Sequence, residues 1–289
     1  MKKYIKNYGY SVKERLLNLK NSKGYPYMYL LSRYLCERLL FRIANSPYRN
    51  HFLLKGGSLL YAYEGLEYRP TIDLDFLAEK LNRDRDYLIG IFSEILVIPC
   101  LEDGVTFDPD TLSAESIAVD KKYPGTRLLF TAHLDSIVHP MSIDIGFGDV
   151  VTPYPLLLDY PTLIEGLPAP NLYAYSLETL IAEKFHTMVE RDESNSRMKD
   201  FFDVYQAFQN QKIDRQLLQE AIANTFANRQ MHFHESLQLF TPEFANDPQR
   251  NMMWKSFLKK IRWKQEIPFP TVMESIRENL QCYWNETLA

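Results

Sequence analysis

Cysteine is scarce in this sequence of 289 residues, and neither an excess of basic residues nor a long apolar run is present. The three cysteines, Cys36, Cys100 and Cys282, are far apart and none belongs to a CxxC pair. Neither a disulfide framework nor a cysteine-ligated zinc site is therefore indicated. The six histidines include the HFH run at His232 to His234, but no HExxH or other metal-ligand spacing surrounds them.

The formal net charge of −4 at pH 7 argues against a generally basic nucleic-acid-binding protein, although it leaves room for a local basic surface. No segment approaches the roughly 18 consecutive apolar residues of a membrane-spanning helix. The first residues also lack the apolar stretch of a secretion signal. We therefore expect a cytoplasmic protein without a membrane partner.

Hydrophobic residues make up 46% of the chain, which is enough for a sizeable core. Their periodicity predicts helices from Ser11 and over 27–45, a strand over 51–54, a short helix over 58–65, and helices from Leu177 almost to the end. Strands are predicted over 71–76, 126–135 and 141–149. This order predicts an α/β (α+β) fold, in which a mixed-sheet lobe carries N-terminal helices and precedes a helical lobe. The proline-rich segment 150–176 suits a boundary, so we expect domains over 1–170 and 171–289.

Two aspartates separated by one leucine stand out in the TIDLDF stretch. On a strand, Asp73 and Asp75 project to the same side, while Ile72, Leu74 and Phe76 face the core. Asp144, in SIDIG, is predicted to lie on the polar side of another strand. Clustered carboxylates repel one another unless a cation neutralises them, and Mg²⁺ prefers such oxygen ligands. A solvated strand face is the plainer interpretation of the DxD pair alone.

A glycine turn precedes these acids, in KGGSLL. Backbone amides at Gly56 and Gly57, leading into a helix, can approach phosphates closely, and the Ser58 hydroxyl is another possible donor. With the aspartates, this pattern resembles the nucleotidyltransferase fold shared with DNA polymerase beta. The resemblance covers about 52–146. It implies that the glycine–serine turn contacts nucleotide phosphates and that Asp73, Asp75 and Asp144 hold the catalytic metal.

A second group of polar residues lies within the predicted helices that follow Leu177. Lys184 falls near the middle of an apolar stripe, so it is either a snorkelling lysine or a cation directed towards a triphosphate. In the next helix we expect Lys199 and Asp203 to share the side opposite the buried stripe, with Asp200 beside them.

Together, KGGSLL…TIDLDF, LIAEK and RMKDFFDVY resemble the AbiEii/AbiGii nucleotidyltransferase toxin family of abortive-infection and toxin–antitoxin operons. The resemblance extends from about Leu53 to Tyr205. It implies transfer of a nucleotide from an NTP, with tRNA acceptor ends among the acceptors, and a cognate antitoxin. It makes Lys184 a nucleotide-phosphate contact and assigns functional roles to Asp200 and Asp203. The chain departs from the pattern after the glycine–serine turn, where LLYAY lacks the basic residue that many relatives carry.

A local basic surface is predicted in WKSFLKKIRWK, residues 254–264. On a helix, Trp254, Phe257, Leu258 and Ile261 would pack inward. This leaves Lys255, Lys259 and Arg262 available to phosphates. An ordinary solvated helix face fits the same residues.

The sequence thus predicts a Mg²⁺-dependent nucleotidyltransferase toxin that acts on RNA. Its catalytic residues would be Asp73 and Asp75, together with Asp144 or Asp203. Two alternatives stay open at this point, namely nucleotidylation of a protein hydroxyl and a non-catalytic module that binds a nucleotide or a partner.

Overall fold

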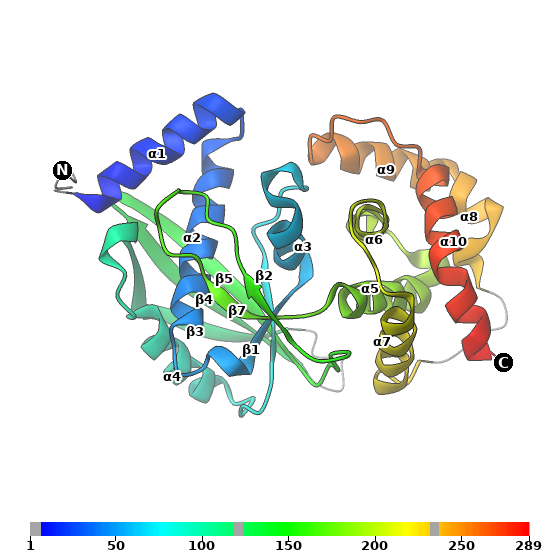
Figure 1. Cartoon of the computed structure of the whole chain (residues 1–289), viewed down its shortest axis with the longest axis horizontal. Helices are drawn as coiled ribbons and strands as arrows, with labels where there is room; N and C mark the ends of the chain where they lie inside the picture. Colours follow the sequence, from blue (N-terminus) through cyan, green and yellow to red (C-terminus); the bar gives the residue numbers. More distant parts are fainter. Residues whose placement is uncertain (1–6, 118–123, 232–236, 289) are drawn as a thin grey trace. The chain divides into compact units, whose positions relative to one another are not determined.

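The computed structural model describes residues 7–117, 124–231 and 237–288 (Figure 1). The histidines at His232 to His234 lie outside these ranges. The chain forms two compact units, the first from residues 1–148 and 156–174 and the second from 149–155 and 175–289. The sequence predicted one boundary, at residue 170. In the structure, Asp149–Pro155 belongs to the second unit, and residues 156–174 belong again to the first.

The first unit is built on a mixed sheet, which has seven strands in the described part of the chain. Their order is β3-β4-β5-β2-β1-β7-β6, with β2–β5 and β1–β7 parallel and the other pairs antiparallel. The strands are β1 (Phe52–Lys55), β2 (Leu74–Ala78), β3 (Val105–Ile117), β4 (Gly125–Leu134), β5 (Ile137–Phe147), β6 (Leu156–Asp159) and β7 (Asn171–Ala174). The predicted mixed α/β class is confirmed, and the proline-rich segment expected to be a boundary also supplies β6 and β7.

Four helices belong to this unit within the described residues: α1 (Tyr8–Lys23), α2 (Tyr27–Ala44), α3 (Gly56–Glu64) and α4 (Arg85–Leu96). α2 contacts α4 and β7, and α4 contacts β3, so these two helices cover one face of the sheet. Phe52 of β1 packs edge to face against Phe76 of β2 and against Phe92 of α4, which places the hydrophobic core between these helices and the sheet. α1 begins before the predicted Ser11, because the Asn7 side chain accepts a hydrogen bond from the backbone N–H of Tyr10.

The second unit is helical and is formed from α5 (Leu177–Arg191), α6 (Met198–Asn210), α7 (Arg215–Asn228), α8 (Pro242–Asn246), α9 (Pro248–Lys260) and α10 (Phe269–Leu288). Its core is strongly aromatic. Phe202 and Phe269 both lie against Trp254, whose indole N–H donates to the Ile267 carbonyl at 2.7 Å. The buried indole is therefore satisfied, and α9 is fixed to the segment that leads into α10.

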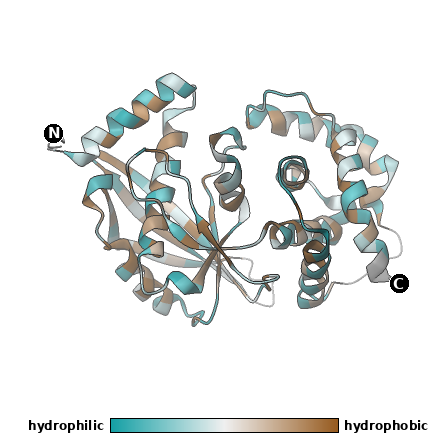
Figure 2. Cartoon of the chain, viewed as in Figure 1, coloured by the Kyte–Doolittle hydropathy of each residue, from teal (hydrophilic) through white to brown (hydrophobic). Residues whose placement is uncertain are grey.

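Hydrophobic residues recur at intervals along the strands and helices, with hydrophilic residues between them (Figure 2). Among the described helices, none is both long enough and apolar enough to cross a membrane.

Candidate functional site

The glycine turn joins β1 directly to α3. Gly56 has φ +69°, a backbone conformation that side chains other than glycine rarely adopt. A Cβ at this position would also collide with the Asp75 carboxylate oxygen Oδ2. Glycine at 56 therefore lets a catalytic candidate from β2 lie against the backbone at the start of the helix.

Gly57 is helical and closely surrounded. A Cβ there would lie 2.8 Å from Thr71 Oγ1 and 3.1 Å from an Arg69 guanidinium nitrogen. Arg69 and Thr71 are both buried. The sequence reasoning missed these two residues, although they stand only a few positions ahead of the aspartates.

Ser58 is fully buried, and its hydroxyl is already hydrogen-bonded. It donates to the Asp73 carbonyl at 2.6 Å and accepts from the Arg33 guanidinium at 3.2 Å. The predicted phosphate donor thus holds the backbone that leads into β2. Its bonds explain why a small hydroxyl residue is needed at this position.

Arg33, in α2, is a residue that the sequence reasoning did not select. Its buried guanidinium also donates to the Thr71 carbonyl at 3.2 Å and to the Tyr160 hydroxyl, and it lies 3.9 Å from the centroid of the Tyr61 ring. This single cation therefore connects α2, the glycine–serine turn and the approach to Asp73. A buried arginine within an apolar helix pattern was the available signal, since such a residue requires several partners.

The two aspartates do not share one strand as predicted, because β2 begins only at Leu74. Thr71 is buried and Ile72 is 50% exposed, the reverse of the predicted alternation. The Ser58 bond to the Asp73 carbonyl takes that backbone group out of the sheet. Asp73 is exposed just ahead of the strand, and Asp75 is half-buried within it.

Asp144 lies next to Asp75, because parallel strands β2 and β5 pair these two residues in register. The core positions predicted for β5, Met141, Ile143, Ile145 and Phe147, are buried as expected. Two acids that are 69 positions apart in the sequence, the difference between 144 and 75, thus become neighbours on one face of the sheet.

Charged residues on the neighbouring strands pair with Asp75 and Asp144 in turn, so that a charged row crosses five adjacent strands. The members of this charged row, in spatial order, are Lys55, Asp75, Asp144, Arg127 and Glu115. Opposite residues on paired strands share a face of the sheet, so the two acids at the centre have a cation on each side. The sequence reasoning did not identify Lys55, Arg127 or Glu115.

Arg127 binds Asp144 through two parallel hydrogen bonds, from Nε to Oδ1 at 2.7 Å and from Nη2 to Oδ2 at 2.8 Å. The hydrogen bond with Asp144 and the charge of that carboxylate raise the pKa of Arg127 further above its usual value. The short turn between β4 and β5 could have revealed this pair. Leu134 pairs with Ile137 across two residues, and counting back from them places Arg127 opposite Asp144.

The remaining predicted site residues form a separate cluster in the second unit. The Lys184 ammonium group lies 2.7 Å from Asp200 Oδ1 and 2.9 Å from Asp203 Oδ2. Arg197 contacts the other oxygen of Asp200 at 2.5 Å. Burial opposes the charged form of Asp200, but the two cations outweigh burial and hold the pKa of this carboxyl below its ordinary value.

This cluster corrects the predicted arrangement on α6. Asp203 is completely buried, whereas Lys199 is exposed, so they do not share the solvated side of the helix. Asp203 faces α5 because its partner there is Lys184. Lys184 is an ion-paired lysine rather than a snorkelling one, and its side chain is only 12% exposed.

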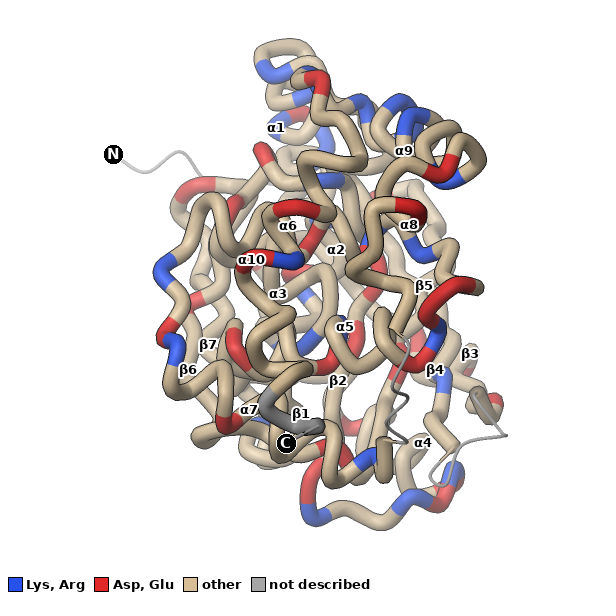
Figure 3. The backbone as a smooth tube through the Cα atoms, turned by 90° about the vertical axis from the view of Figure 1, so that its right-hand side faces the viewer, with Lys and Arg blue, Asp and Glu red and all other residues tan. Residues whose placement is uncertain are grey.

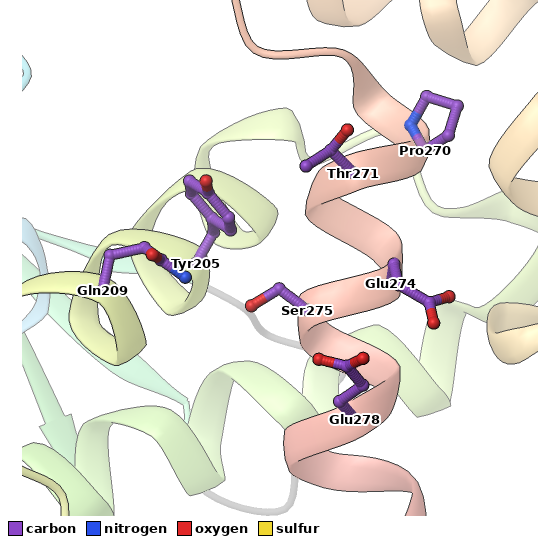
Figure 4. Close-up of a pocket in the computed structure, with 7 residues that line it drawn as sticks. All are labelled: Tyr205, Gln209, Pro270, Thr271, Glu274, Ser275 and Glu278. Carbon is purple, nitrogen blue, oxygen red and sulfur yellow. The ribbon is translucent and has the colours of Figure 1, made fainter.

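The second unit also contains a pocket of about 560 Å³ between α6 and α10 (Figure 4). Tyr205 and Gln209 of α6 line it together with residues of α10 that include Thr271, Ser275 and Glu278. None of the predicted site residues lines this pocket.

Two solved structures are similar to this chain. A candidate nucleotidyltransferase from H. pylori is similar in structure, with 16% identity, a TM-score of 0.49, and coverage of 92% of this chain and 99% of its own. JHP933 from Helicobacter pylori has 16% identity, a TM-score of 0.44, and coverage of 81% and 94% respectively. At these scores neither structure adds to the argument, and no curated protein matches the sequence.

The match to a family model is decisive. The family described as the nucleotidyl transferase AbiEii toxin of type IV toxin–antitoxin systems matches residues 38–275. This range contains every predicted site residue and most of both units. The chain therefore belongs to the AbiEii nucleotidyltransferase toxins, and an NTP substrate and an antitoxin partner follow from that membership.

Proposed function

We propose that this toxin transfers a nucleoside monophosphate from an NTP to a hydroxyl group of RNA, at the acceptor end of tRNA, in a Mg²⁺-dependent reaction. The observation that supports metal dependence is the pairing of Asp75 with Asp144 on adjacent parallel strands, with Asp73 just ahead of β2. Like charges this close favour a cation between or beside them.

The donor chemistry of these residues fits Mg²⁺, which prefers carboxylate oxygens and retains several waters. Among the described residues, no three His, Cys, Asp or Glu side chains are grouped so that they could hold a metal ion. Asp73 and Asp75 are therefore the proposed protein ligands, and water and nucleotide phosphates would supply the others. When bound, the ion neutralises charge on the phosphates.

In the proposed reaction, the RNA hydroxyl oxygen forms a bond to the α-phosphorus. The bond from that phosphorus to the bridging oxygen of the β-phosphate breaks, and pyrophosphate leaves with the electron pair. The hydroxyl proton passes to a carboxylate, for which Asp144, Asp200 and Asp203 are the candidates.

The proposed phosphate contacts of the first unit are the backbone amides of Gly56 and Gly57 at the start of α3. The positive end of a helix dipole and its unsatisfied N–H groups favour anions there. Ser58 supports the turn through the Asp73 carbonyl. The proposed phosphate contact of Lys184 continues to rest on the family resemblance.

An RNA acceptor is supported by the basic surface of α9 and the residues that follow it. No acid occurs between Pro248 and Lys264. Exposed cations alternate there with buried or half-buried aromatic residues, and they form blue segments along α9 in Figure 3. These exposed residues are Lys255, Lys259, Lys260, Arg262 and Lys264. Such a surface matches a phosphate backbone.

The test is the transfer of label from each α-labelled NTP, in turn, to total RNA by the purified chain. Asp73→Asn and Asp75→Asn, alone and together, should abolish transfer, whereas Asp110→Asn, at an exposed acid of β3, should leave it unchanged. Chelation of divalent cations should also stop the reaction. Undiminished transfer by the double variant would refute the mechanism.

The acceptor is identified in lysate by treating the labelled product with nuclease or with protease. Label released by nuclease supports RNA, while label released only by protease shows that a protein hydroxyl is modified instead. Binding of NTP without any transfer, with or without Mg²⁺, would point to a non-catalytic module.

A further inference from the structure

Arg127 occupies an unusual place for a cation in a metal-dependent active site. Its guanidinium donates two hydrogen bonds to Asp144, one of the three predicted metal-binding carboxylates. The two side chains are 40% and 30% exposed, so this pair lies at the surface of the sheet rather than in its core. It is therefore accessible to ions and substrate.

The guanidinium engages both carboxylate oxygens of Asp144 at once. A metal ion that bound either oxygen would lie within a few ångströms of the arginine charge, and the two cations would repel each other. The ion pair with Arg127 and the coordination of a metal ion therefore compete for the Asp144 carboxylate.

The charged row also provides an alternative position for the arginine. Arg127 Nη1 is 4.0 Å from Glu115 Oε1, on the side away from Asp144. A small shift of this long side chain would bring it to Glu115 and release Asp144. On the other side of Asp144 lies Asp75, one of the two remaining proposed ligands.

We propose that Arg127 is a positioning residue that serves as an internal counter-ion for Asp144 and competes with the divalent cation for that carboxylate. This inference rests on the proposed metal dependence of the site. In the resting chain Asp73 and Asp75 would hold the metal, and Asp144 would become available to it only when Arg127 moves towards Glu115. In the metal-free protein, the charge of Arg127 also reduces the repulsion between Asp144 and its neighbour Asp75.

The experiment measures Mn²⁺ binding to the purified full chain by isothermal titration calorimetry, without NTP. Four proteins are compared: the wild type, Arg127→Gln, Asp144→Asn and the combined variant. Arg127→Gln should bind Mn²⁺ about tenfold more tightly than the wild type. This is a usual coupling between two cations that bind the same carboxylate, here the Arg127 guanidinium and Mn²⁺. Asp144→Asn should change the wild-type affinity little, because Arg127 already occupies that carboxylate.

The combined variant carries the decisive comparison. If Asp144 causes the gain, Asp144→Asn in the Arg127→Gln background should remove it and restore an affinity close to that of the wild type. An Arg127→Gln protein that is folded by circular dichroism but binds Mn²⁺ no more tightly than the wild type overturns the proposal. So does a gain that persists without Asp144.

Arg127→Lys provides a second measurement if the glutamine variant does not fold. Lysine keeps the charge but loses the two-pronged geometry, so the affinity for Mn²⁺ should rise by a smaller factor, and an unchanged or lower affinity contradicts competition. Failure of the proposed function would look different. In that case Asp73→Asn with Asp75→Asn would bind Mn²⁺ as well as the wild type, whatever residue 127 is.

Discussion

At the scale of single residues, the site depends on groups that position others rather than on the acids alone. Ser58 donates to the Asp73 carbonyl, Arg33 donates to the Thr71 carbonyl, and Gly56 makes room for the Asp75 carboxylate. Each is a small or buried group whose replacement would move an aspartate without removing it. Misplacement by about 1 Å can lower a rate 100-fold.

Gly56→Ala tests this positioning. The new Cβ would collide with Asp75 Oδ2 and would require an unfavourable φ, so we expect about 1–2 kcal/mol lower stability and at least a roughly tenfold loss of nucleotide transfer. Gly24→Ala is the matched control, because Gly24 also has a positive φ but a Cβ added there would meet no atom within 4 Å. Urea unfolding and labelled-NTP transfer measure the two effects. Equal activity of the two variants would contradict a role for the space at Gly56.

At the scale of elements, α2 carries a row of buried ionisable groups through an otherwise apolar helix. Glu37 is buried, and its carboxylate accepts from the Arg38 guanidinium at 2.5 Å and from the Leu163 backbone N–H at 2.6 Å. Burial outweighs these bonds and raises the pKa of Glu37 from 4.5 to about 7. The folded protein thus binds a proton here more tightly than the unfolded chain.

The sign of the pH dependence follows from this raised pKa. The stability contributed by protonated Glu37 is fully present below pH 4.5 and is lost as the pH rises through about 7. The loss amounts to at most about 3 kcal/mol. Glu37→Gln does not titrate, so the free energy of unfolding of the wild type, relative to this variant, should fall between about pH 5 and about pH 8.

Urea unfolding of the wild type and of Glu37→Gln, at about pH 5 and about pH 8, measures the difference in their free energies of unfolding. Glu102→Gln, at an exposed glutamate in the turn before β3, should retain the wild-type pH dependence. A constant difference between the wild type and Glu37→Gln across this range would show that the carboxyl is ionised throughout.

At the scale of the whole molecule, the chain forms two units, and each unit is made from two separate segments of the sequence. Asp149–Pro155 leaves the first unit and joins the second before β6 and β7 complete the sheet. The attachment is specific. Thr179 Oγ1, on α5, accepts from the Thr152 backbone N–H and donates to the Thr152 carbonyl, both at 2.9 Å, and Asp149 binds Arg229 at 2.8 Å.

Thr179→Val should loosen this attachment. Valine has nearly the same shape but leaves the buried Thr152 backbone N–H without its hydrogen bond, which costs about 1–3 kcal/mol. Hydrogen exchange at the Thr152 amide should accelerate, and urea unfolding should report lower stability. Thr187→Val, on the same helix, loses only a bond to the Glu183 carbonyl of its own helix and should change little. Unaltered exchange at Thr152 in Thr179→Val would contradict this account of the attachment.

The sequence by itself determined the features that depend on local periodicity and local chemistry. It predicted α2 almost to the residue and the buried side of β5, and its motifs led to the correct family. The alternation in TIDLDF failed at Ile72 because tertiary hydrogen bonds on either side of it, from Arg33 to the Thr71 carbonyl and from Ser58 to the Asp73 carbonyl, override the local pattern. Asp203 was placed on the wrong side of α6 because an apolar stripe gives no sign of a buried ion pair with a different helix.

Only the tertiary structure decided which charges meet. Pairing of parallel strands sets Asp75 beside Asp144 across a long separation in the sequence, and no local pattern encodes that register. The partners of the charged row and the cluster around Lys184 likewise join residues from different elements. The physical reason is that strand and helix patterns determine the face on which a residue lies, while the free energy of the complete packed fold determines its neighbour.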